Sequence, residues 1–151
     1  MPSRKNLEIK GLKVKSSFAD SARPVLSHHF KRISRRAEEY TASPTEENLH
    51  NLRIALRRFR YLLEVYYPLI KTTRFKTVYG MAVDLQDLLG ERRDLDVMQL
   101  KLKNIFNSAN NPLPASVVTE LQGARAKADE KIAEKLPQFI AARQVRKLIG
   151  K

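Results

Sequence analysis

The sequence predicts an all-α protein, an antiparallel bundle of four to five helices. Apolar residues recur at spacings of three and four along most of the chain, which is the period of a helix buried on one face. The segments between these runs are short, and no alternating strand pattern of consequence interrupts them. The composition agrees, because 42% of the residues are hydrophobic and only 7% aromatic, enough for a mostly aliphatic core.

Each of the first two helices is predicted from its own apolar run. The first covers about Phe18 to Tyr40, and Pro24 is expected in its first turn, where proline is tolerated. The second covers about 46–70. Thr45 precedes two acidic residues, as expected at a helix start, and Pro68 indicates the helix end.

A break is predicted in the middle of the chain, at Gly90. The third helix covers about 74–89, and its apolar stripe stops there. A second stripe follows, rotated by very roughly a quarter turn if the helix ran on. Gly90 is therefore expected to end or kink the helix, with Asp94 or Asp96 capping the next one.

The chain is expected to hold one domain behind a short leader. Residues 1–16 carry five basic residues against one acid and are predicted to be a basic flexible leader. Residues 17–151 are predicted to form a single helical bundle. Its last helix covers about 115–148, after the proline-containing loop 107–114, and Pro137 is expected to divide it.

Composition excludes several classes of function. There are 29 Lys and Arg against 16 Asp and Glu, and this net charge of +13 attracts polyanions. With no cysteine and three histidines, we expect neither a thiolate site nor a histidine-rich metal centre. The five scattered glycines form no phosphate-binding loop, and no apolar run reaches the ~20 residues that span a membrane. We therefore expect a cytoplasmic protein with no cofactor and no membrane partner.

A stripe of basic residues runs along the second predicted helix. His50, Arg53, Arg57 and Arg60 fall within about 80° of one another and extend over ~15 Å of the helix axis. No acidic residue interrupts the stripe. Such a stripe is often only a solvated face, but the missing acids favour an anion-binding surface. Arg58 stands apart from it.

The first predicted helix supplies a second basic row. His28, Arg32 and Arg35 share a side away from the apolar face, with Arg36 at its margin. If the two helices are neighbours, the two rows would flank one groove. His29 falls on the apolar face of this helix, so we interpret it as a core histidine.

Two motifs resemble those of a known family. The run His50-Asn-Leu-Arg53-Ile-Ala-Leu-Arg57-Arg58-Phe-Arg60-Tyr61 resembles the signature helix of CHAD domains, the conserved-histidine α-helical domains. Leu89-Gly90-Glu-Arg-Arg93-Asp94-Leu-Asp96-Val97 resembles their second motif. The resemblance covers roughly residues 18–106. It implies a helical fold that binds inorganic polyphosphate through a basic surface, in proteins often associated with polyphosphate granules.

The chain departs from this family in length. Family members commonly contain two helical bundles that face each other across a basic cleft, and 151 residues hold only one. We therefore expect a homodimer that completes the two-bundle cleft.

Three classes of function are weighed. We favour polyphosphate binding, because a flexible chain of phosphates needs an array of guanidinium groups and no base-stacking platform. Nonspecific DNA or RNA binding is the alternative, since the net charge favours any polyanion. An enzyme is not expected, because no clustered acids of a Glu-x-Glu-x-Lys strand and no nucleophile–base pair are evident.

Asp94 and Asp96 are interpreted as helix caps or partners of Arg93 and its neighbours rather than as a metal pair. The predicted polyphosphate-binding residues are His28, Arg32, Arg35, Arg36, His50, Arg53, Arg57, Arg58, Arg60 and Arg93.

Overall fold

The protein is a bundle of five α-helices, seen here in a computed structural model that describes residues 8–150. The elements are α1 (Phe18–Ala42), α2 (Glu46–Val65), the short 3-10 helix η2 (Tyr67–Leu69), α3 (Thr72–Ser108), α4 (Ala115–Ala141) and α5 (Arg143–Ile149). Within the described residues there is no strand. The predicted all-α bundle is therefore confirmed.

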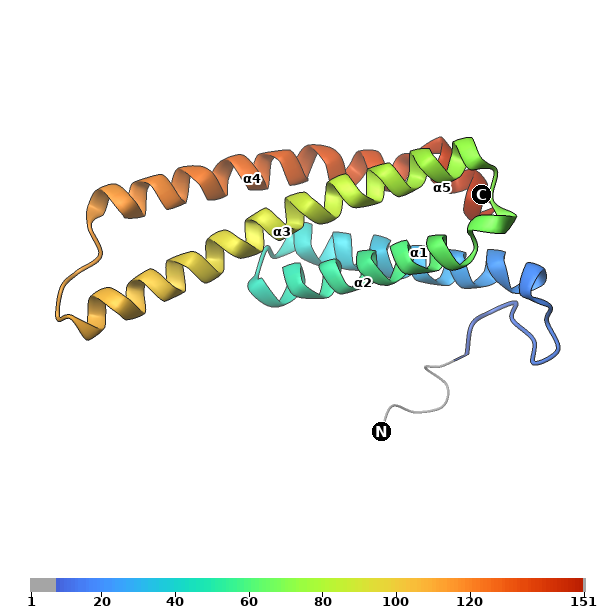
Figure 1. The fold of residues 1–151 in the computed structure, drawn as a ribbon, viewed down its shortest axis with the longest axis horizontal. Coiled ribbons are helices and arrows are strands. Elements are labelled where there is room, and N and C mark those ends of the chain that lie inside the picture. Colours follow the sequence, from blue (N-terminus) through green and yellow to red (C-terminus); the bar gives the residue numbers. More distant parts are fainter. Residues whose placement is uncertain (1–7, 151) are drawn as a thin grey trace.

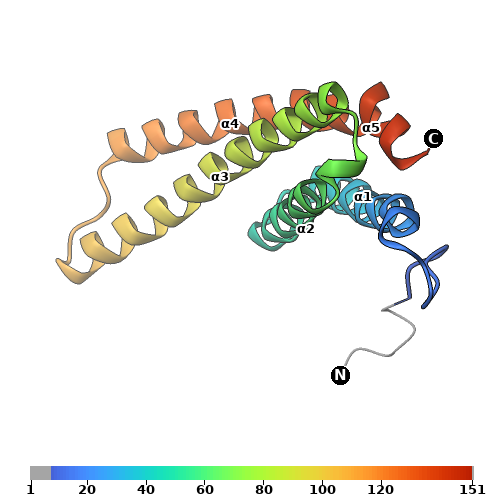
Figure 2. The same ribbon diagram turned by 45° about the vertical axis from the view of Figure 1, so that its right-hand side comes forward.

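The helices form two antiparallel hairpins (Figure 1). One hairpin is α1 with α2 and the other is α3 with α4, and they pack together chiefly through α2 and α3. The short α5 folds back against α1, α3 and α4. Figures 1 and 2 both show that the loop end of the α3–α4 hairpin extends well past the α1–α2 hairpin.

Side-chain caps define where the first two helices begin. The Ser17 hydroxyl accepts a hydrogen bond from the Asp20 amide at 3.1 Å, and the Thr45 hydroxyl accepts one from the Asn48 amide at 3.2 Å. The predicted start of the second helix is therefore confirmed, since a capped first turn satisfies amides that have no partner within the helix. Pro24 lies inside α1, in its second turn and not in the first.

The core is where α1, α2 and α4 meet. Phe30, Phe59 and Phe139 are all buried, with ring centroids 5.9–6.3 Å apart. Leu residues of α2 and α3 continue this core along the bundle, and the buried Val145 and Ile149 of α5 close one end. Burial of these apolar side chains supplies the main stabilisation of the bundle.

The predicted break at Gly90 is wrong. α3 continues through it without interruption, from Thr72 to Ser108. Its buried positions keep the spacing of three and four past the glycine, but they are occupied there by two charged residues, Arg92 and Asp96. The apolar residues that suggested a second stripe include Met98 and Ile105, which are exposed. Asp94 and Asp96 therefore lie in mid-helix and cap nothing.

The C-terminal division also lies elsewhere than predicted. Pro137 lies inside α4, and the helix is interrupted instead at Ala142, between α4 and α5. No helix among residues 8–150 is both long and apolar enough to cross a membrane.

The predicted leader falls partly outside the structure. Residues 1–7 lie outside the described residues. The remainder forms two turns, in which the Leu12 amide bonds the Ile9 carbonyl and the Ser16 amide bonds the Lys13 carbonyl. Ile9 is partly buried against the core.

Candidate anion-binding groove

A small basic cavity lies between α2 and α3. It has a volume of about 70 Å³ and is lined by His50, Arg53, Ile54, Arg57 and Gln86. The structure thus brings together three of the four residues of the predicted stripe. Gln86 comes from α3 and was not predicted, because nothing in the sequence indicates which α3 residue faces the stripe.

We call the basic strip of α2 from Arg60 to Glu46, with the α3 side chains that face it, the basic groove. At one end of this groove an arginine lies near an acidic residue. Arg60 Nε is 3.8 Å from the Glu64 carboxylate, and its guanidinium lies over the rings of Tyr61 and Tyr79, 5.6 and 5.9 Å from their centroids. The Tyr79 hydroxyl donates to Glu64 at 2.7 Å, and this hydrogen bond raises the pKa of Tyr79. The charge of Arg60 is therefore partly compensated by Glu64.

At the other end an arginine is likewise paired with an acidic residue. Arg93 Nη1 donates to a Glu46 carboxylate oxygen at 2.7 Å, which joins α3 to the first turn of α2. Between these two ends, Arg53 and Arg57 form no ion pair with any residue in 8–150. The uncompensated positive charge of the groove is therefore at its middle.

Two buried polar atoms in the groove also lack a partner. Arg53 Nε and Gln86 Oε1 have no hydrogen bond to any described residue, and the same holds for Arg60 Nε at the groove end. Nearly all buried polar atoms in proteins are paired, so unpartnered ones call for an explanation. A bound anion could accept a hydrogen bond from Arg53 Nε, whereas Gln86 Oε1 is itself an acceptor and could not bond an anion. The middle of the groove is the part best suited to receive an anion.

A second basic surface lies on the opposite flank of α2, toward α1. It consists of His28, His29 and Arg32 on α1 and Arg58 on α2. The two imidazole rings meet edge to face, 5.3 Å apart. Burial lowers the pKa of His29 to about 4, helped by the positive charges of His28, Arg32 and Arg58. Burial, then Arg32 and Lys31, also lower the pKa of His28.

This surface corrects two expectations. His29 is half-buried beside cations and is no member of the core. The basic rows of the first two helices also do not face each other. The stripe of His50, Arg53 and Arg57 lines the cavity between α2 and α3. The α2 residue near Arg32 of the α1 row is Arg58. Burial and the charges of Arg58, Arg35 and Arg36 lower the pKa of Arg32.

The remaining cations of the α1 row have an acidic partner. Arg36 Nη1 lies 2.6 Å and Arg35 Nε 3.6 Å from the Glu39 carboxylate. Part of their charge is therefore already compensated, unlike that of Arg53 and Arg57.

The second motif contributes Arg92 and Asp96, both buried, to an ionic cluster with partly exposed residues of α4. Arg92 donates to Asp96 at 2.5 Å and to Asp129 of α4 at 2.6 Å, and Arg125 lies 3.3 Å from Asp96. Burial lowers the pKa of Arg92, but its hydrogen bonds to the two carboxylates outweigh this and raise it. Asp96 therefore binds arginines, as interpreted, but they are Arg92 and Arg125, whereas Arg93 bonds Glu46. Among residues 8–150, no three His, Asp or Glu side chains gather to hold a metal ion.

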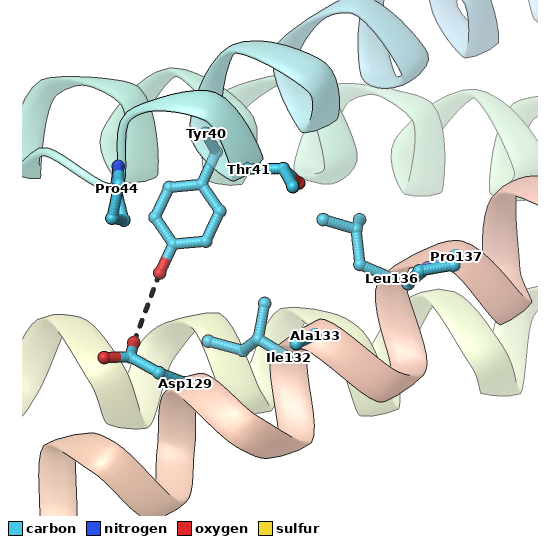
Figure 3. A pocket seen from close by; sticks show the side chains of 8 residues that line it. All are labelled: Tyr40, Thr41, Pro44, Asp129, Ile132, Ala133, Leu136 and Pro137. Atoms are coloured by element: carbon cyan, nitrogen blue, oxygen red, sulfur yellow. Dashed lines mark hydrogen bonds between the residues drawn. The ribbon is translucent and has the colours of Figure 1, made fainter.

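A separate crevice between α1 and α4 is mostly apolar (Figure 3). It has a volume of about 240 Å³, and Ile132 and Leu136 of α4 form much of its wall. The Tyr40 hydroxyl points to Asp129 at 3.4 Å, and burial together with the Asp129 charge raises the pKa of Tyr40 to about 12. No Lys, Arg or His lines this crevice, so it is separate from the basic groove.

Comparison with known proteins identifies the family. The family model described as CHAD domain matches residues 4–103, which include α1, α2, most of α3 and both motifs. No curated protein and no solved structure matches the chain significantly. The family match covers about two thirds of the 151 residues. The chain therefore belongs to the CHAD domain family.

Proposed function

We propose that this protein binds inorganic polyphosphate without catalysis, through the basic groove between α2 and α3. The observation that carries the proposal is the uncompensated charge of Arg53 and Arg57, beside His50 in one cavity. CHAD domains are known in general to bind polyphosphate. The same proposal associates the protein with polyphosphate granules.

The chemistry of the groove suits a chain of phosphates. Each phosphate is anionic, and a guanidinium fork grips two of its oxygens at once. The stripe presents cations along ~15 Å of one rigid helix, so it can contact several phosphates of one chain at the same time. Single-stranded nucleic acid is usually held by stacking on several aromatic rings. Here the rings of Tyr61 and Tyr79 lie beside Arg60 at one end, but no Phe, Tyr or Trp lines the cavity of His50, Arg53 and Arg57, which favours polyphosphate over DNA or RNA.

The test is a triple substitution in the groove. Replacing Arg53, Arg57 and Arg60 by Gln should abolish the binding of labelled long-chain polyphosphate, measured by fluorescence anisotropy, while circular dichroism shows unchanged helicity. The matched control replaces Lys127, Lys131 and Lys135, three exposed cations of α4, by Gln and removes the same charge. It should retain most of the affinity. Unchanged affinity in the folded groove variant would remove the groove from the mechanism.

A competition experiment separates polyphosphate from other anions. At about 0.15 M ionic strength, where exposed charges are largely screened, duplex DNA, RNA and short phosphates are titrated against bound polyphosphate. We expect polyphosphate to win by orders of magnitude per phosphate. Equal competition by DNA or RNA, or equal losses in the groove and control variants, would indicate a general polyanion binder. Phosphate released during the titration would contradict a non-catalytic role.

A further inference from the structure

Gly90 occupies a helix interior without a packing reason. A glycine there costs about 1 kcal/mol of helix stability relative to alanine. A Cβ atom added at Gly90 would meet no heavy atom of a neighbouring element within 4 Å. Its backbone is ordinary helix within α3, so no unusual conformation requires glycine. Neither the packing nor the backbone of the protein explains this residue.

The antiparallel register of α2 and α3 places Gly90 at the groove. Three contacts define this register. Tyr79 of α3 bonds Glu64 near the end of α2, and Gln86 shares the cavity with Arg53 in the middle of α2. Further along α3, Arg93 bonds Glu46 at the start of α2. Gly90 lies between Gln86 and Arg93, one turn from each, within about 60° of both around the helix. Its counterpart on α2 is therefore the turn between Arg53 and Glu46, which carries His50.

We propose that a phosphate unit of the bound chain passes directly over Gly90, between His50 and Arg93. This inference rests on the proposed function and adds a path for the ligand. The missing side chain leaves open the space that a phosphate needs to approach α3 closely. A Coulombic attraction weakens with distance, so holding the chain away from α3 would weaken its contact with Arg93.

The ion pair at this end of the groove fits such a path. The Glu46 side chain is 63% exposed, so its pair with Arg93 is well solvated and contributes little stability. A phosphate above Gly90 can replace this carboxylate on the Arg93 guanidinium and accept a hydrogen bond from the His50 imidazole. The groove then extends from Arg57 to Arg93 and uses both helices.

The experiment compares two glycines in helix interiors. Gly123 of α4 also has open space at its Cβ position, and no α4 residue lines the cavity between α2 and α3. Gly90→Ala and Gly123→Ala should both raise the melting temperature, because alanine favours the helix. Only Gly90→Ala should weaken polyphosphate binding, by about tenfold if it removes one charge-assisted hydrogen bond. Gly90→Leu should weaken it further.

The outcomes distinguish this inference from the proposed function. If wild type binds polyphosphate and both Gly90 variants bind equally well, the path over Gly90 is wrong while the groove stands. If Gly90→Ala and Gly123→Ala lose affinity alike, the effect is not local and the path is also wrong. If wild type does not bind polyphosphate, the proposed function fails and the path falls with it.

Discussion

His29 is a histidine held neutral by its surroundings. Its pKa of about 4 is below the 6.5 expected in the unfolded chain, because of burial and the charges of His28, Arg32 and Arg58. Between these two values the unfolded state binds more protons than the folded state, so stability falls as the pH decreases from about 6.5 toward 4. After allowance for partial exposure, we expect His29 to account for about 1 kcal/mol of stability lost between pH 7 and pH 5.

The measurement is urea unfolding at both pH values for wild type and His29→Gln. Carboxylates titrate in the same range, so the prediction concerns the difference between the two proteins. Wild type should lose more stability than the variant. Equal losses would show that the histidine titrates as it does in the unfolded chain. A polyanion bound near Arg32 and Arg58 should shrink the difference, because it offsets the charges that lower the pKa.

At the level of elements, α3 is joined to α4 by an ionic cluster in which the buried Arg92 and Asp96 meet the partly exposed Asp129 and Arg125. Asp96 is buried and receives two arginines, so Asp96→Asn leaves buried positive charge with less compensation. We expect it to lower the free energy of unfolding by about 2–3 kcal/mol, measured in urea. Asp94→Asn makes the same change at an exposed position two residues away and should alter stability by less than about 0.5 kcal/mol. Similar losses in both variants would contradict the role of the cluster.

The same cluster explains why the continuous α3 was not predicted. Hydrophobic periodicity marks a buried face only where that face is apolar. At Arg92 and Asp96 the buried face is charged, and compensation by Asp129 and Arg125 makes this burial tolerable. These partners lie 29 residues (Asp96 to Arg125) and 37 residues (Arg92 to Asp129) further along the chain, and no local pattern indicates them. By contrast, the start of α2 was predictable because its cap, Thr45, acts on its own first turn.

At the level of the whole molecule, the α3–α4 hairpin extends past α1 and α2 (Figure 2). Met98, Leu100 and Ile105 of α3 are 50–63% exposed, an unusual concentration of apolar side chains on one helix end. The homodimer stays a prediction, and these exposed apolar side chains favour a contact between two copies of the chain at this end of α3. Light scattering coupled to size exclusion should give twice the chain mass of 17.4 kDa. A monomer that still binds polyphosphate tightly would contradict it.

The sequence by itself determined the helical class, the start of the second helix, the net charge and the stripe of His50, Arg53, Arg57 and Arg60. These features depend on residue type and on spacing within one helix, which local geometry converts directly into a shared face. The residues matched by the family model, 4–103, include these local runs.

Only the tertiary structure decided which of these cations keep their charge uncompensated. Arg60 and Arg93 acquire carboxylate neighbours, Arg58 joins the α1 surface, and Gln86 enters the groove. Each of these outcomes depends on the register between two helices, and a shift of one residue rotates every side chain by about 100°. Register is set by the packing of the buried faces along their whole length, so no single motif could indicate it.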